Sequence, residues 1–533
     1  MSSRTLLDLV AEGAARVASD KPAVAAGDAS LTFGALLSGA RGIAAELSEA
    51  GIGRGDRVGI WMDKTPQCVQ TILGVLEAGA AYTPLDPRAP WRRCRSIALD
   101  CDLAAVAVDG PRRGLLPSFL EGQSPRLVLI DGEDAEPPES LHRNATTRWE
   151  TLRRAAARPA AKLASPGPGD IAYILYTSGS TGVPKGVVHT HRSGVAFTTW
   201  VQERFGIVST DVFSSHAPFH FDLSISDLYA SLGSGASIRL ISSVEGMLAP
   251  YLVRMIEEWG ITVWYSVPSV LASMLNLGDL EARRFEDLRL LLFAGEVFPT
   301  PPLRRLRRAL PRVRLVNLFG PTETNVCTYY EVPGDIPDDR TAPIPIGKAC
   351  EHLETFVIDD EGREAGIGAE GMLWARGDNL MLGYWNDPAR TASTLRPDPR
   401  GREGIAYCTG DRVRLQPDGD YEFLGRSDEM IKVRGYRVEL GEIESVLTAH
   451  PEVLEAVALA VPDAAGGNRV VAAVVYRDGR APDPAEIRRF TMQYLPGYMV
   501  PESVEVRPSI PRTSTGKADR SALRRELSRK ENP

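Results

Sequence analysis

The sequence predicts an α/β protein with a large N-terminal domain, residues 1–425, and a small α+β C-terminal domain, residues 426–533. Its 533 residues exceed what one compact core normally organises. Short β-branched runs alternate with helical patterns through most of the chain, as they do in parallel βαβ units. This alternation breaks near Gly425–Lys432. About a hundred residues follow the break, which is enough for a small separate domain.

Individual elements follow from hydrophobic periodicity. Residues 56–61 (DRVGIW) are predicted to form a buried strand, and residues 66–79 have the period of a helix. Beyond the break, the pattern predicts two helices and two strands, at residues 441–448, 485–494, 457–461 and 470–476.

Composition excludes several classes of protein. The net charge is −8, with 43% hydrophobic and 24% charged residues, which does not indicate a nucleic-acid or membrane-surface binder. The six cysteines are scattered and form no C-x-x-C pair, so we expect a reduced, cytoplasmic protein without structural zinc. No apolar run approaches the length of a membrane span, and the N-terminus is typical of an amphipathic helix rather than a signal peptide.

The strongest motif is YTSGSTGVPKG at residues 176–186, directly after the strand-like run 171–175. Binding a polyphosphate requires many N–H and O–H donors close together without bulky side chains between them. A Walker P-loop is excluded, because Gly186 follows the lysine where that motif needs Ser or Thr. The predicted phosphate contacts are Thr177, Ser178, Gly179, Ser180, Thr181, Gly182 and Lys185.

Five further segments occur in a characteristic order: LEAGAAYTPLD at 76–86, NLFGPTET at 317–324, YCTGDR at 407–412, GRSDEMIKVRG at 425–435 and TSTGKADR at 513–520. Together with the phosphate loop they resemble the motifs of the adenylate-forming superfamily, which includes acyl-CoA synthetases, luciferases and the adenylation domains of peptide synthetases. The resemblance spans nearly the whole chain. It implies a large N-terminal domain with mixed and parallel sheets flanked by helices, and a small mobile α+β C-terminal domain.

The resemblance assigns roles in nucleotide binding. It implies that Thr322 contacts the α-phosphate and that Glu323 holds Mg²⁺, a metal that carboxylates suit. Adenine would stack on Phe319, where relatives often have Tyr, and would hydrogen-bond Asn317. The remaining nucleotide contacts implied by these motifs are Gly320, Asp411 for the ribose hydroxyls, and Arg426.

Two lysines carry the expected chemistry. Lys517 resembles the family lysine that bridges the incoming carboxylate and the α-phosphate, where a cation stabilises the charge of the transition state. Lys432 resembles a residue on the opposite side of the small domain. By the resemblance, that domain rotates about a hinge at Asp428 and presents the face carrying Lys432 for thioester formation.

The segment FHFDLSISD at 219–227 resembles the peptide-synthetase motif whose aspartate binds the substrate's α-amine, and Asp222 takes that place. A buried aspartate would be costly opposite an acid that has no amine. Alignment with the family's pocket gives a mostly apolar lining without a charge for a charged side chain. The substrate contacts implied are Asp222, Leu223, Ser226, Tyr265, Leu292, Ala294, Leu318, Val326, Cys327 and Lys517.

This set resembles that of stand-alone prolyl-adenylating enzymes. Ser226 departs from it, since a larger apolar residue is expected there, and this leaves room for a modified ring or a slightly larger amino acid. A pocket of this kind discriminates one methylene by only about 1–3 kcal/mol. Four histidines, at 189, 191, 216 and 220, have no matching Cys or Glu, so a metal site is not expected there. His220 is expected at the wall of the pocket instead.

We therefore expect ATP-dependent activation of an amino acid, best matched by L-proline, as an aminoacyl-AMP with Mg²⁺ as cofactor. Because no carrier-domain motif follows Lys517, the expected acceptor is the phosphopantetheine thiol of a separate peptidyl carrier protein. The alternatives are an acyl-CoA ligase for a small carboxylic acid and an enzyme for another small apolar amino acid. A luciferase-like oxidase has no support in the sequence. A non-catalytic nucleotide sensor would show damage in the motifs, which are intact.

Overall fold

The computed structural model describes residues 3–131, 145–148, 165–179, 183–427, 430–462, 468–477, 483–512 and 518–531. The chain divides into two compact units. The first consists of Met1–Pro87, Ile97–Tyr176 and Gly186–Ser427, and the second of Arg88–Ser96, Thr177–Lys185 and Asp428–Pro533. The expected hinge residue, Asp428, lies outside the described residues.

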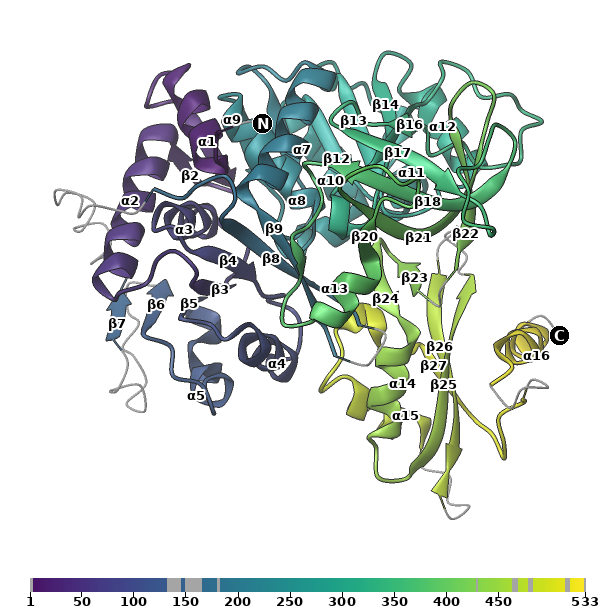
Figure 1. Ribbon diagram of the computed structural model, residues 1–533. Coiled ribbons are helices and arrows are strands. Elements are labelled where there is room, and N and C mark those ends of the chain that lie inside the picture. Colours follow the sequence, from purple (N-terminus) through teal and green to yellow (C-terminus); the bar gives the residue numbers. More distant parts are fainter. Residues whose placement is uncertain are drawn as a thin grey trace. The chain divides into compact units, whose positions relative to one another are not determined.

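The first unit contains two large sheets (Figure 1). In the first sheet the described strands follow the order β16 (Lys348–Ala349), β15 (Thr328–Glu331), β14 (Arg314–Phe319), β13 (Leu290–Ala294), β12 (Val263–Ser266), β10 (Val212–Ser215), β11 (Ser237–Leu240), β1 (Pro22–Ala26) and β2 (Ala29–Thr32). The second sheet has the order β19 (Gly383–Tyr384), β9 (Lys185–Thr190), β8 (Ile171–Thr177), β4 (Ala81–Pro84), β3 (Arg57–Trp61), β5 (Ala105–Asp109), β6 (Leu127–Asp131) and β7 (Ala145–Arg148).

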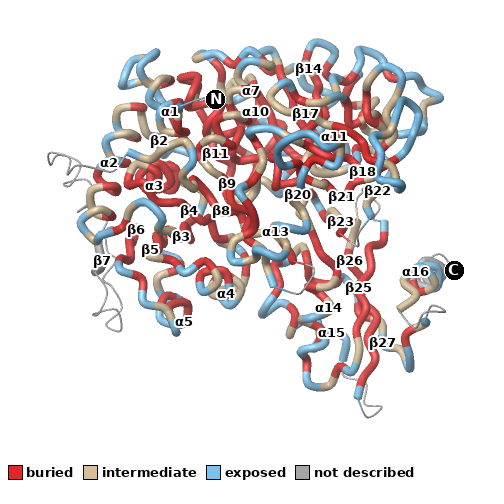
Figure 2. The backbone as a smooth tube through the Cα atoms, viewed as in Figure 1, coloured by how far each residue is buried: buried red, intermediate tan, exposed pale blue. Residues whose placement is uncertain are grey.

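Pairing at the centre of these sheets is parallel. Antiparallel pairs occur at both edges of the first sheet and at the β19 edge of the second, whereas β7 at its other edge pairs in parallel with β6. Strands β10 to β14 pair in parallel, whereas β15 and β16 continue the sheet antiparallel. In the second sheet, β3 pairs in parallel with β4 and β5, and β19 pairs antiparallel with β9. Central strands such as β5 and β13 are buried along their whole length (Figure 2), as parallel strands covered on both faces must be.

The helices of this unit cover the sheets in layers. One core joins residues of both sheets to α1 (Leu6–Ala15), α2 (Phe33–Glu49), α3 (Pro66–Glu77) and α7 (His191–Phe205). A second core lies on the other face of the β10–β14 sheet, under α10 (Ala249–Glu258), α11 (Pro268–Leu277) and α12 (Thr300–Ala309). Strand β12 shows the alternation, because Val263 and Tyr265 join the first core and Trp264 joins the second.

Shorter helices of this unit are α5 (Leu116–Phe119), α8 (Leu223–Ile225), α9 (Ser231–Gly233) and α13 (Pro388–Thr394), whereas the residues of α4 (Trp91–Cys101) are divided between the two units. A third sheet has the order β17 (Leu353–Ile358), β18 (Glu370–Gly377), β21 (Ile405–Leu415) and β20 (Leu395–Pro397), with β22 (Tyr421–Arg426) paired to β21. It matters for the site because β21 and β22 carry two of the predicted nucleotide contacts.

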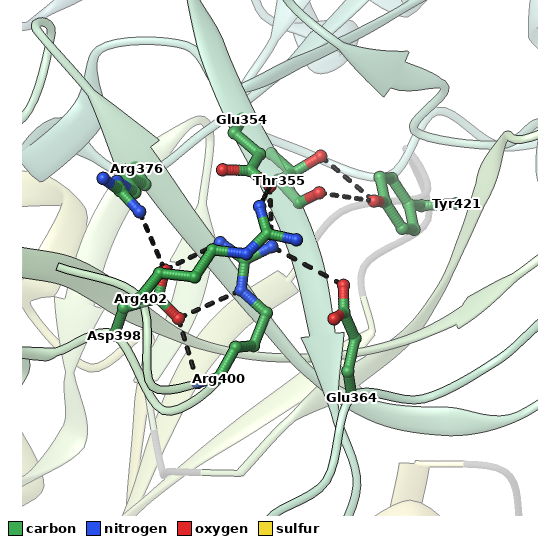
Figure 3. Close-up of polar contacts among 8 residues, drawn as sticks. All are labelled: Glu354, Thr355, Glu364, Arg376, Asp398, Arg400, Arg402 and Tyr421. Atoms are coloured by element: carbon green, nitrogen blue, oxygen red, sulfur yellow. Dashed lines mark hydrogen bonds and ion pairs between the residues drawn. The ribbon is translucent and has the colours of Figure 1, made fainter.

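Figure 3 shows the ion pairs that hold the loop after β20 to this sheet. The Arg400 guanidinium donates to Asp398 at 2.7 Å and to Glu354 at 2.6 Å, and it lies 3.4 Å from the Phe356 ring centroid. Both members of the central pair are buried, since the side chains of Arg400 and Asp398 are 4% and 0% exposed. Hydrogen bonds from Arg400 hold the pKa of Asp398 well below its usual range. Asp398 is therefore ionised in the folded protein at neutral pH.

The second unit has its own cores. The strands β25 (Val453–Pro462), β26 (Asn468–Tyr476) and β27 (Ser503–Val506) form one sheet, and β23 (Met430–Val433) pairs with β24 (Tyr436–Glu439). Residues of α14 (Leu440–Thr448) and α15 (Pro484–Thr491) fill one core with this sheet. Leu523 of α16 (Arg520–Glu531) packs in another, with Val457 and Leu459.

The predicted α/β class, with a large N-terminal part and a small α+β part, is confirmed. The expected helix at 66–79 ends two residues earlier, because Gly79 adopts a left-handed conformation with φ +83° just after the Ala78 cap. None of the helices in the described ranges is long and apolar enough to cross a membrane.

Replacing Arg400 by Met should destabilise the first unit by about 2–4 kcal/mol, because it leaves the buried Asp398 charge with fewer partners. Urea unfolding of both proteins measures the effect. Arg402→Met is the matched control, since that side chain is 54% exposed and also pairs with Glu354.

The Arg400–Asp398 ion pair also determines how the destabilisation by Arg400→Met depends on pH. Asp398 has a lower pKa when folded, so its stabilisation is complete above the ordinary carboxyl pKa near about 4 and is lost as pH falls through the folded value. The stability gap between parent and Arg400→Met should be constant from pH 5 to 8 and narrow only well below about pH 4. Equal unfolding midpoints for parent and variant at pH 7 would contradict this account.

Candidate active site

The turn between β14 and β15 carries the predicted phosphate and metal residues. Its short helix, Thr322–Thr324, is followed by Asn325 at φ +55°. The Cys327 N–H donates to the Phe319 carbonyl oxygen at 2.8 Å and closes the turn. Gly320 is required here, because an added Cβ would lie 2.7 Å from the Val326 Cα. The turn therefore has one tightly defined backbone path.

Glu323 is completely buried within this turn. Its carboxylate accepts a hydrogen bond from the Tyr384 hydroxyl at 2.6 Å, and its carbonyl oxygen accepts one from the Met381 N–H at 2.8 Å. Asn379 donates its amide to the carbonyl oxygens of Thr324 and Val326, at 2.7 and 3.1 Å. Residues 379–384, including strand β19, thus hold the carboxylate and the C-terminal end of the short helix in place.

His189 supports the same turn from β9. Its Nε2 lies 2.8 Å from the Thr322 carbonyl oxygen and its Nδ1 lies 3.0 Å from the Ser193 hydroxyl. Burial lowers the pKa of His189 to about 4, so the ring is neutral near pH 7. Because a carbonyl can only accept, Nε2 must carry the hydrogen and Nδ1 must accept from Ser193. The ring also stacks on Tyr173, with the centroids 5.0 Å apart.

Asp222 lies against this turn at the start of α8. The Thr322 hydroxyl donates to its carboxylate at 2.6 Å. Burial, with a smaller contribution from the charge of Asp222, raises the pKa of both Tyr265 and Tyr173 well above the ordinary value, so both phenols are neutral. The acid predicted to bind an amine is therefore directly joined to the residue predicted to contact phosphate.

The predicted substrate lining comes together on one side of the β10–β14 sheet. Tyr265 pairs with Leu292 across β12 and β13, and Ala294 pairs with Leu318 across β13 and β14. These four join Leu223 and Val326 in the first core. Ser226 is buried as well, four residues after Asp222. Cys327 packs under the third sheet instead, with residues such as Val357 and Val413.

The predicted adenine contacts lie on β14, and the predicted ribose contact and its basic neighbour lie on the paired strands β21 and β22. Asn317 is 8% exposed and donates its amide to the Pro345 carbonyl oxygen at 3.1 Å. Phe319 lies 5.6 Å from Phe423, centroid to centroid. Asp411 on β21 accepts a hydrogen bond from Arg426 on β22 at 2.6 Å. The structure thus pairs the predicted ribose carboxylate with the predicted basic residue.

Part of the phosphate loop is described. Gly179 approaches its own loop closely, because an added Cβ would lie 1.9 Å from the Val183 carbonyl oxygen. Within the second unit, the Ser178 hydroxyl donates to the Arg437 carbonyl oxygen at 2.8 Å, and the Gly179 N–H donates to Glu442 at 3.2 Å. Thr177 ends β8 and Lys185 begins β9. Ser180, Thr181 and Gly182 lie outside the described residues.

Of the two predicted lysines, Lys432 lies within the described residues and Lys517 does not. Lys432 lies on β23 opposite Arg437, and its carbonyl oxygen accepts a hydrogen bond from Asn468. Lys517 lies outside the described residues, so its predicted role stays a prediction.

Sequence reasoning missed His189, Tyr384 and Asn379 as supports of the turn. His189 attracted notice only as one of four histidines, and nothing in its neighbours marks a contact 133 residues away. Two of the other histidines make contacts elsewhere. His216 Nε2 lies 3.3 Å from the Gly246 carbonyl oxygen, and His220 Nε2 lies 3.8 Å from the Asp86 carboxylate. Over the part of the chain that the structure describes, no group of three or more His, Cys, Asp or Glu is placed to hold a metal ion.

Comparison with known proteins agrees with this geometry. The family model for AMP-binding enzymes matches residues 11–385, and the model for the AMP-binding enzyme C-terminal domain matches residues 442–517. An L-proline--[L-prolyl-carrier protein] ligase of Pseudomonas fluorescens is 40% identical, over 93% of this chain and 94% of its own length. A protein of the same name from Streptomyces coelicolor is 37% identical, over 92% of this chain and 91% of its own length.

Solved structures with a similar fold agree with these sequence matches. The amide bond synthetase McbA of Marinactinospora thermotolerans superposes with a TM-score of 0.85 at 27% identity, covering 98% of this chain and 100% of its own. The adenylation domain AlmE of Vibrio cholerae, solved with glycyl-adenosine-5'-phosphate, also gives 0.85, at 25% identity over 99% of this chain and 98% of its own. With matching motifs, fold and family models over most of its length, the chain belongs to the family of AMP-binding enzymes.

Proposed function

We propose that this chain is an amino acid–[carrier protein] ligase that activates L-proline with ATP and transfers it to the phosphopantetheine thiol of a separate carrier protein. The observation that supports this proposal is the hydrogen bond between Thr322, the proposed phosphate contact, and Asp222, the proposed amine-binding acid. Two relatives with 37–40% identity carry the name of L-proline--[L-prolyl-carrier protein] ligase, and they match this chain over more than nine-tenths of its length.

The first half-reaction forms the aminoacyl-AMP. A carboxylate oxygen of proline attacks the α-phosphorus of ATP, a new P–O bond forms, and the bond to the β-phosphate oxygen breaks to release pyrophosphate. Asp222 holds the protonated amine, and the buried lining from Tyr265 to Leu318 excludes water around the ring. Lys517 supplies the cation that bridges the carboxylate and the α-phosphate.

Glu323 suits the Mg²⁺ that this chemistry needs. Mg²⁺ is usually held by one or two carboxylates together with substrate phosphates, and Glu323 offers one buried carboxylate in the phosphate-binding turn. Tyr384 fixes the orientation of that carboxylate through its hydroxyl. When bound, the metal neutralises the charge of the leaving pyrophosphate.

The second half-reaction transfers the prolyl group. The carrier thiol loses its proton and attacks the acyl carbon, a thioester forms, and AMP leaves. The proposed small domain, residues 426–533, rotates about Asp428 between the two steps and presents first Lys517 and then Lys432. An acyl-CoA ligase remains the second candidate for the acceptor, because both acceptors are pantetheine thiols.

ATP–pyrophosphate exchange across proline, pipecolate, alanine and valine tests the substrate, and acylation of a phosphopantetheinylated carrier against free CoA tests the acceptor. We expect exchange to be greatest with proline and thioester to form on the carrier. Absence of exchange with proline would contradict the substrate, whereas efficient acylation of free CoA would favour the second candidate.

Replacing Lys517 by Ala should abolish most of the first half-reaction, with a loss of about 10²–10³ in its rate, because the developing charge loses its cation. Supplied prolyl-AMP should still acylate the carrier at close to the parental rate. Rapid-quench measurement of each half-reaction separates them. Equal losses in both steps would contradict the division of labour between Lys517 and Lys432.

Tyr384→Phe should raise the Mg²⁺ concentration for half-maximal exchange about tenfold, because the variant removes the hydroxyl that orients Glu323 and keeps the ring. The measurement is an Mg²⁺ titration at fixed, saturating proline. Tyr251→Phe is a matched control, since it removes a similar Tyr–Glu hydrogen bond, 2.7 Å long, to Glu245. An unchanged Mg²⁺ requirement in Tyr384→Phe would show that the hydroxyl does not act through Glu323.

A further inference from the structure

One buried hydroxyl in the substrate site has no hydrogen-bond partner. Ser226 is 1% exposed, and its Oγ accepts from and donates to no group in the described part of the chain. A serine in a helix usually donates to a carbonyl oxygen three or four residues earlier. Ser224 does this toward Phe221 at 2.7 Å, and Ser231 does it toward Leu228 at 3.2 Å. Ser226, between them, does not.

The local backbone explains why Ser226 differs. It begins a π-helical segment, Ser226–Ala230, directly after α8. A π-helical turn widens the helix, and such turns are frequent at functional sites. The interruption comes where the helix passes the predicted substrate lining, between Asp222 and Asp227.

Ser226 lies on the substrate side of this helix. Residues four apart share one helix face, so Ser226 follows Asp222 along the same side. Tyr265 packs in the same core as Leu223, the residue that follows Asp222 on this helix. Ser226 and Tyr265 are both buried and both belong to the predicted substrate lining.

Leaving this hydroxyl unpaired is unfavourable, and a hydrogen-bonding group in the substrate would remove that cost. The adjoining surroundings are polar as well. Asp227 is completely buried and interacts with the Lys64 ammonium group, which donates to the carbonyl oxygens of Ser215 and Ala217. Ser226 thus has a small side chain where a larger apolar residue was expected, and its hydroxyl has no partner among the described residues.

We propose that the site selects a five-membered cyclic imino acid whose ring carries a hydroxyl group, and that Ser226 recognises this hydroxyl through a hydrogen bond. This inference rests on the proposed function, since it needs the amine on Asp222 and the ring against Tyr265. A ring hydroxyl both donates and accepts, so it pairs with the Ser226 hydroxyl in either direction. Hydroxyprolines are the substrate class that this chemistry fits, in preference to prolines with an apolar substituent.

The test compares substrates of nearly equal size. ATP–pyrophosphate exchange would be measured for proline, cis- and trans-4-hydroxyproline, trans-3-hydroxyproline and the matching methylprolines. We expect kcat/KM for at least one hydroxyproline to equal or exceed that for proline, and to exceed that for the methylproline of the same geometry about tenfold. A methyl group occupies the space of a hydroxyl without its hydrogen bond, so this ratio reports the bond rather than the volume.

Two variants of Ser226 separate the effect of its hydrogen bond from the effect of the space that its small side chain leaves. Ser226→Ala keeps the space and removes the hydroxyl, so the hydroxyproline-to-methylproline ratio should fall about tenfold. Ser226→Leu fills the space, so both substituted prolines should lose activity relative to proline. The matched control is Ser224→Ala, whose hydroxyl is satisfied by the backbone and whose substitution should leave the ratio as in the parent.

The outcomes distinguish a failure of the hydroxyproline proposal from a failure of the proposed activation of proline. A parent enzyme that prefers methylproline, or one that accepts proline alone, overturns the proposal and leaves proline activation standing. An unchanged ratio in Ser226→Ala also overturns it, and would indicate that a buried water satisfies the hydroxyl. Failure of exchange with every cyclic imino acid would instead contradict the proposed function itself.

Discussion

The hydrogen bond from Thr322 to Asp222 is the constraint on which the rest of the site depends. It joins a turn at the end of β14 to the start of α8, two segments a hundred residues apart in the chain. A carboxylate held close to a phosphate-binding turn is electrostatically unfavourable unless a cation separates them. In the proposed function a protonated amine on the substrate provides that cation, which would favour amino acids over simple carboxylic acids.

Neighbouring buried groups hold this arrangement with little freedom. His189, as a neutral ring, donates to the backbone of Thr322, and Tyr384 donates to the side chain of Glu323. Both contacts come from strands of the second large sheet, whereas Asp222 and the turn belong with the first. Packing both sheets around one core therefore fixes the relative positions of Asp222, the turn and Glu323, the carboxylate proposed to hold Mg²⁺.

Much of this could be predicted from the sequence, and the missing part has a physical reason. The strand–helix alternation and the ordered motifs predicted the α/β class and the family, because periodicity and glycine-rich loops act over short stretches of chain. His189 and Tyr384 could not be found in this way, since their partners lie 133 and 61 residues away and a single His or Tyr carries no local pattern. The unpaired hydroxyl of Ser226 was equally invisible, because it results from a local π-helical turn.

The most direct measurement of the central claim compares proline with cyclopentanecarboxylic acid, which keeps the ring and lacks the amine, in the parent and in Asp222→Asn. The account predicts that the parent activates only proline, and that Asp222→Asn lowers kcat/KM for proline about a hundredfold while narrowing the difference between the two acids. Activation of proline by a folded Asp222→Asn protein at the parental rate would contradict the account.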